Sequence, residues 1–455
     1  MNRFLSSLFF LIIASFLVGC QSVSQNTASE TPLDASLVIT NVNVIEWDGR
    51  DARISSNQAV VIQGDRIALV IDSQSLPSLT TGTQRIDGNN SYILPGFTEM
   101  HGHVPPATDF GDLPATYADD MLFLYIANGV TTVRGMLGYP HQLQLKSDIA
   151  DGTRMGPTLY LAGPSFNGNS IESAEDATRR VLTQNNDGWD LLKIHPGLTL
   201  AEYQALARTA REASMDFAGH VPADVGLINA LAEGQRTIDH LDGYLEYVDA
   251  LNRPISDEEL QILVNLTLTH ETAIVPTQAL WSTLIGAEDP AELAQYPELM
   301  FVPQSVRQNW LNYYNRPSMA YFNQSHAEIQ QQNRQLLLKA LHDANANIIF
   351  GTDAPQLFSV PGFSIHHEIE KMQAAGMPLE AIYYSATVAA GDYFADNDNF
   401  GHIKADQRAD FMLLKDNPLE SAHALKNLQG VLVRGQWLSR EAIDAKLSEI
   451  SERYN

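Results

Sequence analysis

The chain has 455 residues, of which 44% are hydrophobic, so it can build a large buried core and is not an intrinsically disordered protein. Its 54 acidic and 28 basic residues give a formal net charge of −26, which argues against nucleic acid or an anionic lipid surface as the main partner, because both require a basic face. Cys20 is the single cysteine, so neither a disulfide framework nor a cysteine-rich metal site can form.

The first twenty residues have the pattern of an export signal. Arg3 precedes a nearly unbroken apolar run, residues 4–18, which is too short for a comfortable membrane span. Residues 1–20 look like a bacterial lipoprotein signal, in which Cys20 is lipidated and becomes the mature N-terminus. An ordinary signal peptide or an uncleaved anchor helix is the alternative. The polar segment 21–35 is predicted to be a flexible tether.

This signal also predicts a location. Gln21, rather than an aspartate, follows the cysteine, and in proteobacteria this resembles the pattern of an outer-membrane destination. We therefore expect an exported protein that is lipid-anchored at the bacterial outer membrane, facing the periplasm or the cell surface. The lipid would be its only membrane contact.

Strand-like segments occupy both ends of the remaining chain. Residues 37–44 alternate between apolar and polar side chains, and residues 410–414 and 430–435 are short apolar segments with turn residues between them. The middle of the chain, between these two ends, has a different sequence pattern. We expect segments 36–92 and 396–455 to form one small composite β-sandwich.

In the middle of the chain, residues 93–395, short apolar runs alternate with stretches long enough for a helix. The runs begin or lie at residues 92–94, 129–133, 158–161, 191–194, 215–218, 236–238, 272–275 and 347–350. This pattern is typical of an α/β protein with a (β/α)8 TIM-type barrel, whose active site lies at the C-terminal ends of its strands.

Side chains that suit a metal site stand where these runs end. His101 and His103 follow the first run, and residues i and i+2 of an extended segment face the same way, so both imidazoles can reach one ion. The others follow the fourth, fifth, sixth and eighth runs and are Lys193, His220, His240 and Asp353. A lone histidine in such a run is more often a core residue. Their joint placement predicts a metal site, and four histidines with one aspartate suit zinc or a similar divalent ion.

Residues 94–103, Leu-Pro-Gly-Phe-Thr-Glu-Met-His-Gly-His, resemble the first-strand signature of the amidohydrolase superfamily. Residues 386–387 and 401–411 resemble its late helix and its return to the sandwich. The likeness covers essentially the whole mature chain. More narrowly, the chain is similar to the imidazolonepropionase-related branch of this superfamily, which includes prolidase-like dipeptidases with a carboxylated lysine.

The resemblance implies a centre of two divalent metal ions, with Zn²⁺ as the expected metal. Two ligand groups are implied, one for a more buried and one for a more exposed ion: His101, His103 and Asp353, then His220 and His240. Lys193, carboxylated by carbon dioxide, would bridge the ions and separates this chain from mononuclear relatives. A hydroxide shared by both ions would attack the scissile carbonyl, and Asp353 would pass its proton to the leaving nitrogen.

The function that the resemblance favours is hydrolysis of an amide bond in a small peptide-like or N-acyl amino acid substrate. A lactonase, a cyclic amidase or a phosphotriesterase could use the same site, whereas deaminases of this superfamily usually have one metal. A catalytically silent binding lipoprotein is the alternative from another class, but here the ligand set is complete. The sequence leaves the oligomeric state open, a homo-oligomer included.

Two further residues are candidates for contact with the substrate. Arg134 could anchor a substrate carboxylate, and a structural ion pair is an equally good interpretation. His195 shares a face with Lys193 and could touch the substrate, although an isolated histidine is more often a core or surface residue. The continuation His195-Pro196-Gly197, and Gly135 where dipeptidase relatives often have aspartate, depart from the family pattern, so the metal chemistry is better defined than the substrate.

Overall fold

The computed structural model describes residues 31–105, 113–316 and 321–455. The predicted signal segment 1–20 with Cys20, and the tether up to residue 30, lie outside this range. Within it, no helix combines the length and the apolar character that crossing a membrane would require.

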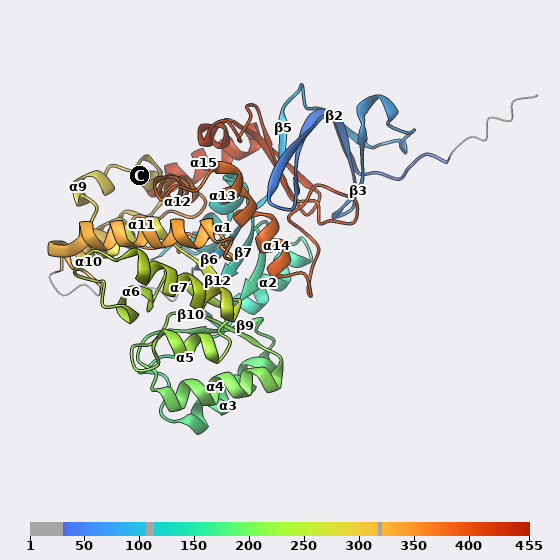
Figure 1. Ribbon diagram of the computed structural model, residues 1–455. Helices are drawn as coiled ribbons and strands as arrows, with labels where there is room; N and C mark the ends of the chain where they lie inside the picture. Colours follow the sequence, from blue (N-terminus) through green and yellow to red (C-terminus); the bar gives the residue numbers. More distant parts are fainter. Residues whose placement is uncertain (1–30, 106–112, 317–320) are drawn as a thin grey trace, which may run out of the picture.

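Strands from both ends of the chain join in one eight-stranded sheet, here called the terminal sheet (Figure 1). Its strands are β1 (Leu37–Asp48), β2 (Asp51–Gln63), β3 (Arg66–Asp72), β4 (Gln84–Asp87), β5 (Tyr92–Pro95), β13 (Phe411–Leu414), β14 (Leu428–Val433) and β15 (Gln436–Ser439). Their order is β15-β14-β13-β5-β1-β2-β3, with β4 beside β1. The antiparallel pair β5–β13 connects the two ends of the chain. The expectation that both termini meet in one β-rich unit is therefore met, while its separation as a sandwich domain stays a prediction.

Two parallel sheets form the middle of the chain. The first contains β6 (Phe97–Gly102), β7 (Val130–Gly135) and β8 (Thr158–Leu161) in that order. The second contains β9 (Leu191–Ile194), β10 (Asp216–Gly219), β11 (Thr237–Asp239) and β12 (Ala273–Val275), paired in sequence order. Nearly all their residues are buried, as expected for parallel strands that are covered on both faces.

Isolated contacts link the two parallel sheets on both sides. Ala162, just after β8, forms a parallel bridge with Leu191 of β9. Ile348 forms a parallel bridge with Ile274 of β12, and the Phe350 carbonyl accepts a hydrogen bond from the Met100 amide of β6. The predicted eighth run, residues 347–350, therefore contributes a bridge rather than a strand. The fold is α/β with parallel sheets, and a closed barrel stays a prediction.

Helices connect and cover these strands (Figure 1). They are α1 (Tyr117–Ala127), α2 (His141–Ala150), α3 (Ala174–Asp187), α4 (Leu200–Ala213), α5 (Gly226–Ala232), α6 (Tyr244–Tyr247), α7 (Asp257–His270), α8 (Gln278–Leu284), α9 (Pro290–Leu293), α10 (Gln304–Tyr314), α11 (Ala327–Asp343), α12 (Ser364–Ala374), α13 (Leu379–Ala386), α14 (Val388–Tyr393) and α15 (Arg440–Tyr454). Capping boxes begin α4 at Thr199 and α7 at Ser256, where each hydroxyl and the glutamate three residues later satisfy orphan amides of the first turn.

Candidate metal centre

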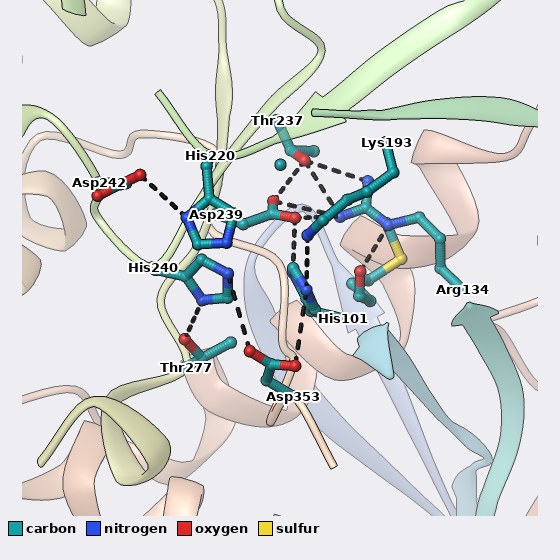
Figure 2. Close-up of polar contacts among 12 residues, drawn as sticks. His101, Arg134, Lys193, His220, Thr237, Asp239, His240, Asp242, Thr277 and Asp353 are labelled. Carbon is teal, nitrogen blue, oxygen red and sulfur yellow. Dashed lines mark hydrogen bonds and ion pairs between the residues drawn. The ribbon is translucent and has the colours of Figure 1, made fainter. Parts of the chain in front are cut away.

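The predicted ligand residues converge at the carboxyl ends of the parallel strands; Figure 2 labels all of them except His103, which lies against Asp353. His101 lies in β6 and Lys193 in β9, whereas the other four lie in segments directly after β6, β10, β11 and residues 347–350: His103, His220, His240 and Asp353. The ring centroids of His101 and His240 are 4.4 Å apart, and those of His220 and His240 are 4.6 Å apart. Residues separated by up to about 250 positions thus form one cluster.

Its tightest part consists of His101, His103 and Asp353. Their candidate ligand atoms lie within 4.8 Å of one another. His103 Nε2 is 2.6 Å from Asp353 Oδ1, and His101 Nε2 is 3.7 Å from the same oxygen. Both imidazoles of the His-x-His pair therefore reach one carboxylate, as their i, i+2 spacing predicts. Imidazole nitrogens and a carboxylate oxygen are the donors that zinc and similar ions take in proteins.

Three of the histidines are held from behind through Nδ1. The partners are an aspartate, another aspartate and a threonine: Asp239 Oδ2 at 2.7 Å from His101, Asp242 Oδ2 at 3.0 Å from His220, and Thr277 Oγ1 at 2.7 Å from His240. A hydrogen bond at Nδ1 orients the ring and selects the tautomer whose Nε2 carries a free lone pair. This arrangement is the usual support of a metal-ligating histidine.

The His240 Nε2 atom gives a direct test of whether the cluster fits a metal ion. It is buried and has no hydrogen-bond partner among the described residues, although it lies 3.8 Å from Asp353 Oδ2. A buried nitrogen without a partner is costly unless it binds something. His240 and Asp353 also adopt left-handed backbone conformations, with φ of 67° and 64°, which are uncommon for non-glycine residues.

Lys193, in β9, is completely buried beside His101. Its Nζ lies 3.0 Å from His101 Nε2, and burial lowers the pKa of the amine to about 8. An ammonium group cannot ligate a cation. Lys193 can therefore take part in a metal centre either as the neutral amine, which burial favours, or after conversion into a group with donor oxygens.

The electrostatics of the cluster favour the protonation states that metal ligands need. Burial, reinforced by Lys193, holds the pKa of His101 well below its usual range, and burial does the same to His240. Burial alone would raise the pKa of Asp353, but His101 and His103 outweigh it, so this pKa lies below its ordinary value. Neutral imidazoles and an ionised carboxylate follow.

Arg134, the predicted substrate anchor, lies in the core beneath the cluster. Its side chain is 0% exposed, and Nε donates to the Met100 carbonyl at 2.5 Å. The two terminal nitrogens donate to Thr237 Oγ1 at 3.1 Å, and one of them lies 3.2 Å from Asp239. These contacts match the alternative interpretation, a structural ion pair. Arg134 holds the carboxylate that in turn holds His101.

His195 lies at the edge of the cluster. It is partly exposed, and its ring stacks on that of His220 with 5.3 Å between centroids. Burial, with Lys193 as a second cause, lowers the pKa of His195, so the ring is neutral at ordinary pH. A neutral imidazole in this position can donate or accept a hydrogen bond at the rim of the centre.

Sequence reasoning missed the residues that support the ligands. Asp239, Asp242 and Thr277 hold the histidines from behind, as described above. Glu99 accepts hydrogen bonds from the amide and the hydroxyl of Thr352, at 2.7 and 2.6 Å, and burial raises its pKa to about 8. The available signal was an acidic residue within two positions of a candidate ligand.

Comparison with known proteins gives a family for this chain. Residues 92–438 match the family model of the amidohydrolase family. An imidazolonepropionase of Paenarthrobacter aurescens (strain TC1) is 25% identical over 166 residues, which cover 35% of this chain and only 39% of the relative's length.

Solved structures agree in fold. The bottromycin amidohydrolase superposes with a TM-score of 0.70 at 22% identity, covering 92% of this chain and 90% of its own. A Xaa-Pro dipeptidase solved with bound methionine superposes with a TM-score of 0.65 at 20% identity, covering 89% of this chain and 99% of its own. At these identities the likeness concerns the fold.

Proposed function

The chain belongs to the amidohydrolase family and is a hydrolase, and we propose that it cleaves the amide bond of small peptide-like or N-acyl amino acid substrates. The observation that carries this proposal is the convergence of the six residues predicted from the sequence, with the Nδ1 atoms of three histidines held from behind. Such pre-oriented nitrogens at strand ends suit metal-assisted hydrolysis.

We propose two divalent ions in this cluster, with Zn²⁺ as the metal that best suits the donors. His101, His103 and Asp353 would hold one ion, and His220 with His240 would hold the other. When bound, the ions would polarise a substrate carbonyl and make water nucleophilic near neutral pH.

Lys193 would join the two sites after carboxylation. Its neutral amine attacks the carbon of carbon dioxide, a nitrogen–carbon bond forms, and one proton leaves. The product carries two oxygens and one negative charge, which replaces a side chain that cannot ligate by one that can. The complete burial of Lys193 beside His101 supports this role, because it keeps the modified group away from bulk water.

The remaining chemistry falls to side chains of this protein. Asp353 accepts the proton of the attacking water on a carboxylate oxygen and delivers it to the leaving nitrogen. Asp239, fixed by Arg134, keeps His101 in place. His195, at the rim, contacts the substrate.

We also propose that the parallel sheets close into a (β/α)8 barrel over residues 93–395, beside a composite sandwich domain of residues 36–92 and 396–455. The bridges Ala162–Leu191 and Ile274–Ile348 support closure, since they lie in the two gaps between the sheets. A closed ring would bring all ligand-bearing strand ends to one mouth.

A substrate panel tests the proposed reaction. The protein is loaded with zinc in bicarbonate buffer and assayed with dipeptides, N-acyl amino acids, cyclic amides, lactones and phosphotriesters. We expect turnover of the first two classes and loss of that turnover after chelation. Turnover confined to lactones, cyclic amides or phosphotriesters would replace amide hydrolysis by one of these alternatives.

The cellular location is a separate proposal, drawn from residues 1–20. We propose export and lipid attachment at Cys20, at the outer membrane. In a bacterial host, wild-type protein should fractionate with membranes and Cys20→Ala should not. Equal distribution of the wild-type protein and Cys20→Ala between membrane and soluble fractions would contradict the proposed lipid anchor.

A further inference from the structure

We propose that a cavity beside the candidate metal centre is a specificity site for an uncharged apolar group, aromatic or branched aliphatic, of the substrate. The cavity has a volume of about 480 Å³. It is called the apolar pocket here, and its main apolar walls are Val104, Leu113, Tyr117, Leu137, Val306 and Trp310. This assignment rests on the amide hydrolysis proposed above and names the substrate class for the same site.

The pocket is continuous with the metal centre. His103 is part of its wall, and so are Pro355 and Gln356, which follow Asp353 by two and three residues. His103 Nε2 lies 2.6 Å from Asp353 Oδ1. A group seated against His103 in the pocket therefore lies next to the cluster.

Helix α10 supplies one wall through its regular spacing. Val306 and Trp310 are four residues apart, as are Ser305 and Asn309, so both pairs stand on neighbouring rows of one helix face. Trp310 packs edge-on against Phe358 with 6.1 Å between ring centroids. This ring contact helps to hold Trp310 in its position in the wall.

The other walls come from the segment after β6, the start of α1 and the segment after β7. Val104 directly follows His103 and is 2% exposed, and Tyr117 at the start of α1 is 5% exposed. Leu137 lies two residues after β7. Pocket and metal centre therefore share the segment that directly follows β6.

The chemistry of the wall decides what it can bind. Apart from His103, the lining residues in the described part of the chain include no lysine, arginine, aspartate or glutamate, and the polar ones are uncharged, such as Ser305, Asn309 and Gln356. A carboxylate or an ammonium group entering here would lose water without gaining an ion partner. An apolar group gains about fourfold in binding per buried methylene, the equivalent of about 0.8 kcal/mol.

The size of the pocket agrees with this role. Small-molecule sites typically measure about 300–1,000 Å³ and are lined mainly by apolar and aromatic side chains. A second cavity, of about 380 Å³, lies beside the other end of the cluster and is lined by Asp242 and Glu246 among others. The absence of such carboxylates from the described wall of the apolar pocket sets the two cavities apart.

Two substrate series test the proposal on the zinc-loaded protein. In the first, glycine carries acetyl, isovaleryl, phenylacetyl or succinyl as the acyl group; in the second, N-acetyl is joined to Gly, Leu, Phe or Asp. We expect kcat/KM for the larger apolar members to exceed that of the acetyl–glycine parent and of the carboxylate-bearing member at least tenfold in one series. Equal rates, or a preference for the charged or smallest member in both series, would overturn the pocket.

Substitution of residues that line the apolar pocket provides a second test of the proposal. Leu137→Arg places a cation in the pocket and should remove the apolar preference while raising the relative rate with the succinyl or Asp member. Val306→Thr, nearly equal in size, should weaken the preference severalfold if Leu137→Arg does not fold. Leu336→Arg, at a position 48% exposed on α11, is the matched control and should leave the preference unchanged. An unchanged preference in folded Leu137→Arg and in Val306→Thr would contradict the assignment.

Binding of benzyl alcohol separates this proposal from the proposed reaction. Its affinity for the zinc-loaded wild-type protein, measured by calorimetry, should fall at least tenfold in Leu137→Arg and stay unchanged in Leu336→Arg. If no amide is hydrolysed but this pattern is found, the pocket stands and the amidase proposal fails. If benzyl alcohol does not bind, or binds equally to the wild type, Leu137→Arg and Leu336→Arg, the proposed role of the apolar pocket is wrong.

Discussion

The terminal sheet and the carboxyl ends of the parallel strands are both deeply buried, but they bury opposite kinds of side chain. The sheet encloses apolar residues that are 0% exposed, among them Ile39, Val60, Ile93 and Phe411. The strand ends enclose ionisable residues that are at most 1% exposed: Glu99, His101, Arg134, Lys193 and Asp239.

This difference separates stability from chemistry. Burial of aliphatic side chains is favourable by itself, at roughly 25 cal/mol per Å². Burial of charged groups is unfavourable unless each finds a partner, and a buried ion pair often does no better than apolar residues of the same volume. The strand ends therefore do not hold the protein together efficiently. Their arrangement makes sense as a preformed ligand set, and substitutions in the two regions should have separable effects.

The largest effect is expected at the metal centre. Asp353→Asn keeps the shape of the side chain but removes the carboxylate that moves the proton, so kcat should fall by about 10²–10⁴-fold. Circular dichroism and the melting temperature should remain close to those of the wild type. Near-normal turnover with metal bound would refute the role of Asp353.

A substitution in the terminal sheet should have the opposite outcome, a loss of stability without a loss of activity. Ile39→Ala removes buried methyl groups from a filled core and should lower the free energy of unfolding by about 2–5 kcal/mol. Urea unfolding measures this loss, and kcat/KM per folded molecule should not change. A more than tenfold loss of kcat/KM in the folded fraction would show that the two regions are not separable.

An intermediate effect is expected where a support residue is changed. Asp239→Asn weakens the acceptor that orients His101 and leaves Arg134 without its charge partner, so zinc affinity should fall about 10–100-fold. Competition with a chelating indicator measures the affinity. Asp51→Asn, exposed in β2, is the control. Equal zinc affinity in Asp239→Asn and the wild type would mean that Asp239 serves only to neutralise Arg134.

The smallest effect is predicted at an exposed position of the terminal sheet. Ile54, in β2, is 40% exposed, so Ile54→Ala should change the free energy of unfolding by no more than about 0.5 kcal/mol. Comparison with Ile39→Ala, the same substitution at a buried position, isolates burial as the cause. A loss as large as that of Ile39→Ala would show that Ile54 is covered in solution.

The convergence of the predicted ligand residues could be anticipated from the sequence because their positions depend on local rules. His101 and His103 share a face through i, i+2 spacing, and His220 and His240 each follow a short apolar run directly. The supports could not be found in this way. Whether a histidine offers Nδ1 or Nε2 to the centre depends on its tertiary neighbours. Thr277 gave no local signal, and although Asp239 and Asp242 flank His240 in the sequence, each holds a different histidine.

Arg134 and the apolar pocket also depend on tertiary neighbours that the local sequence does not reveal. The burial of the guanidinium depends on Asp239, 105 positions away, and charged residues are rarely buried without such a partner. Val104, Leu137 and Val306 come from three separate segments, and only the fold gathers them around one cavity. Residues 347–350 were expected as a strand, but a short apolar run does not determine how many hydrogen-bonded neighbours it acquires.

The most direct test of the metal centre is the number of ions that the protein holds. Wild-type protein and Lys193→Ala are incubated with excess zinc in bicarbonate buffer, freed of loose metal, and analysed by elemental mass spectrometry. Two ions per wild-type chain are predicted, with loss of metal in Lys193→Ala and partial rescue of its activity by short carboxylic acids. A wild-type protein that stays free of metal, or a Lys193→Ala variant that keeps two ions and full activity, would contradict the proposed centre.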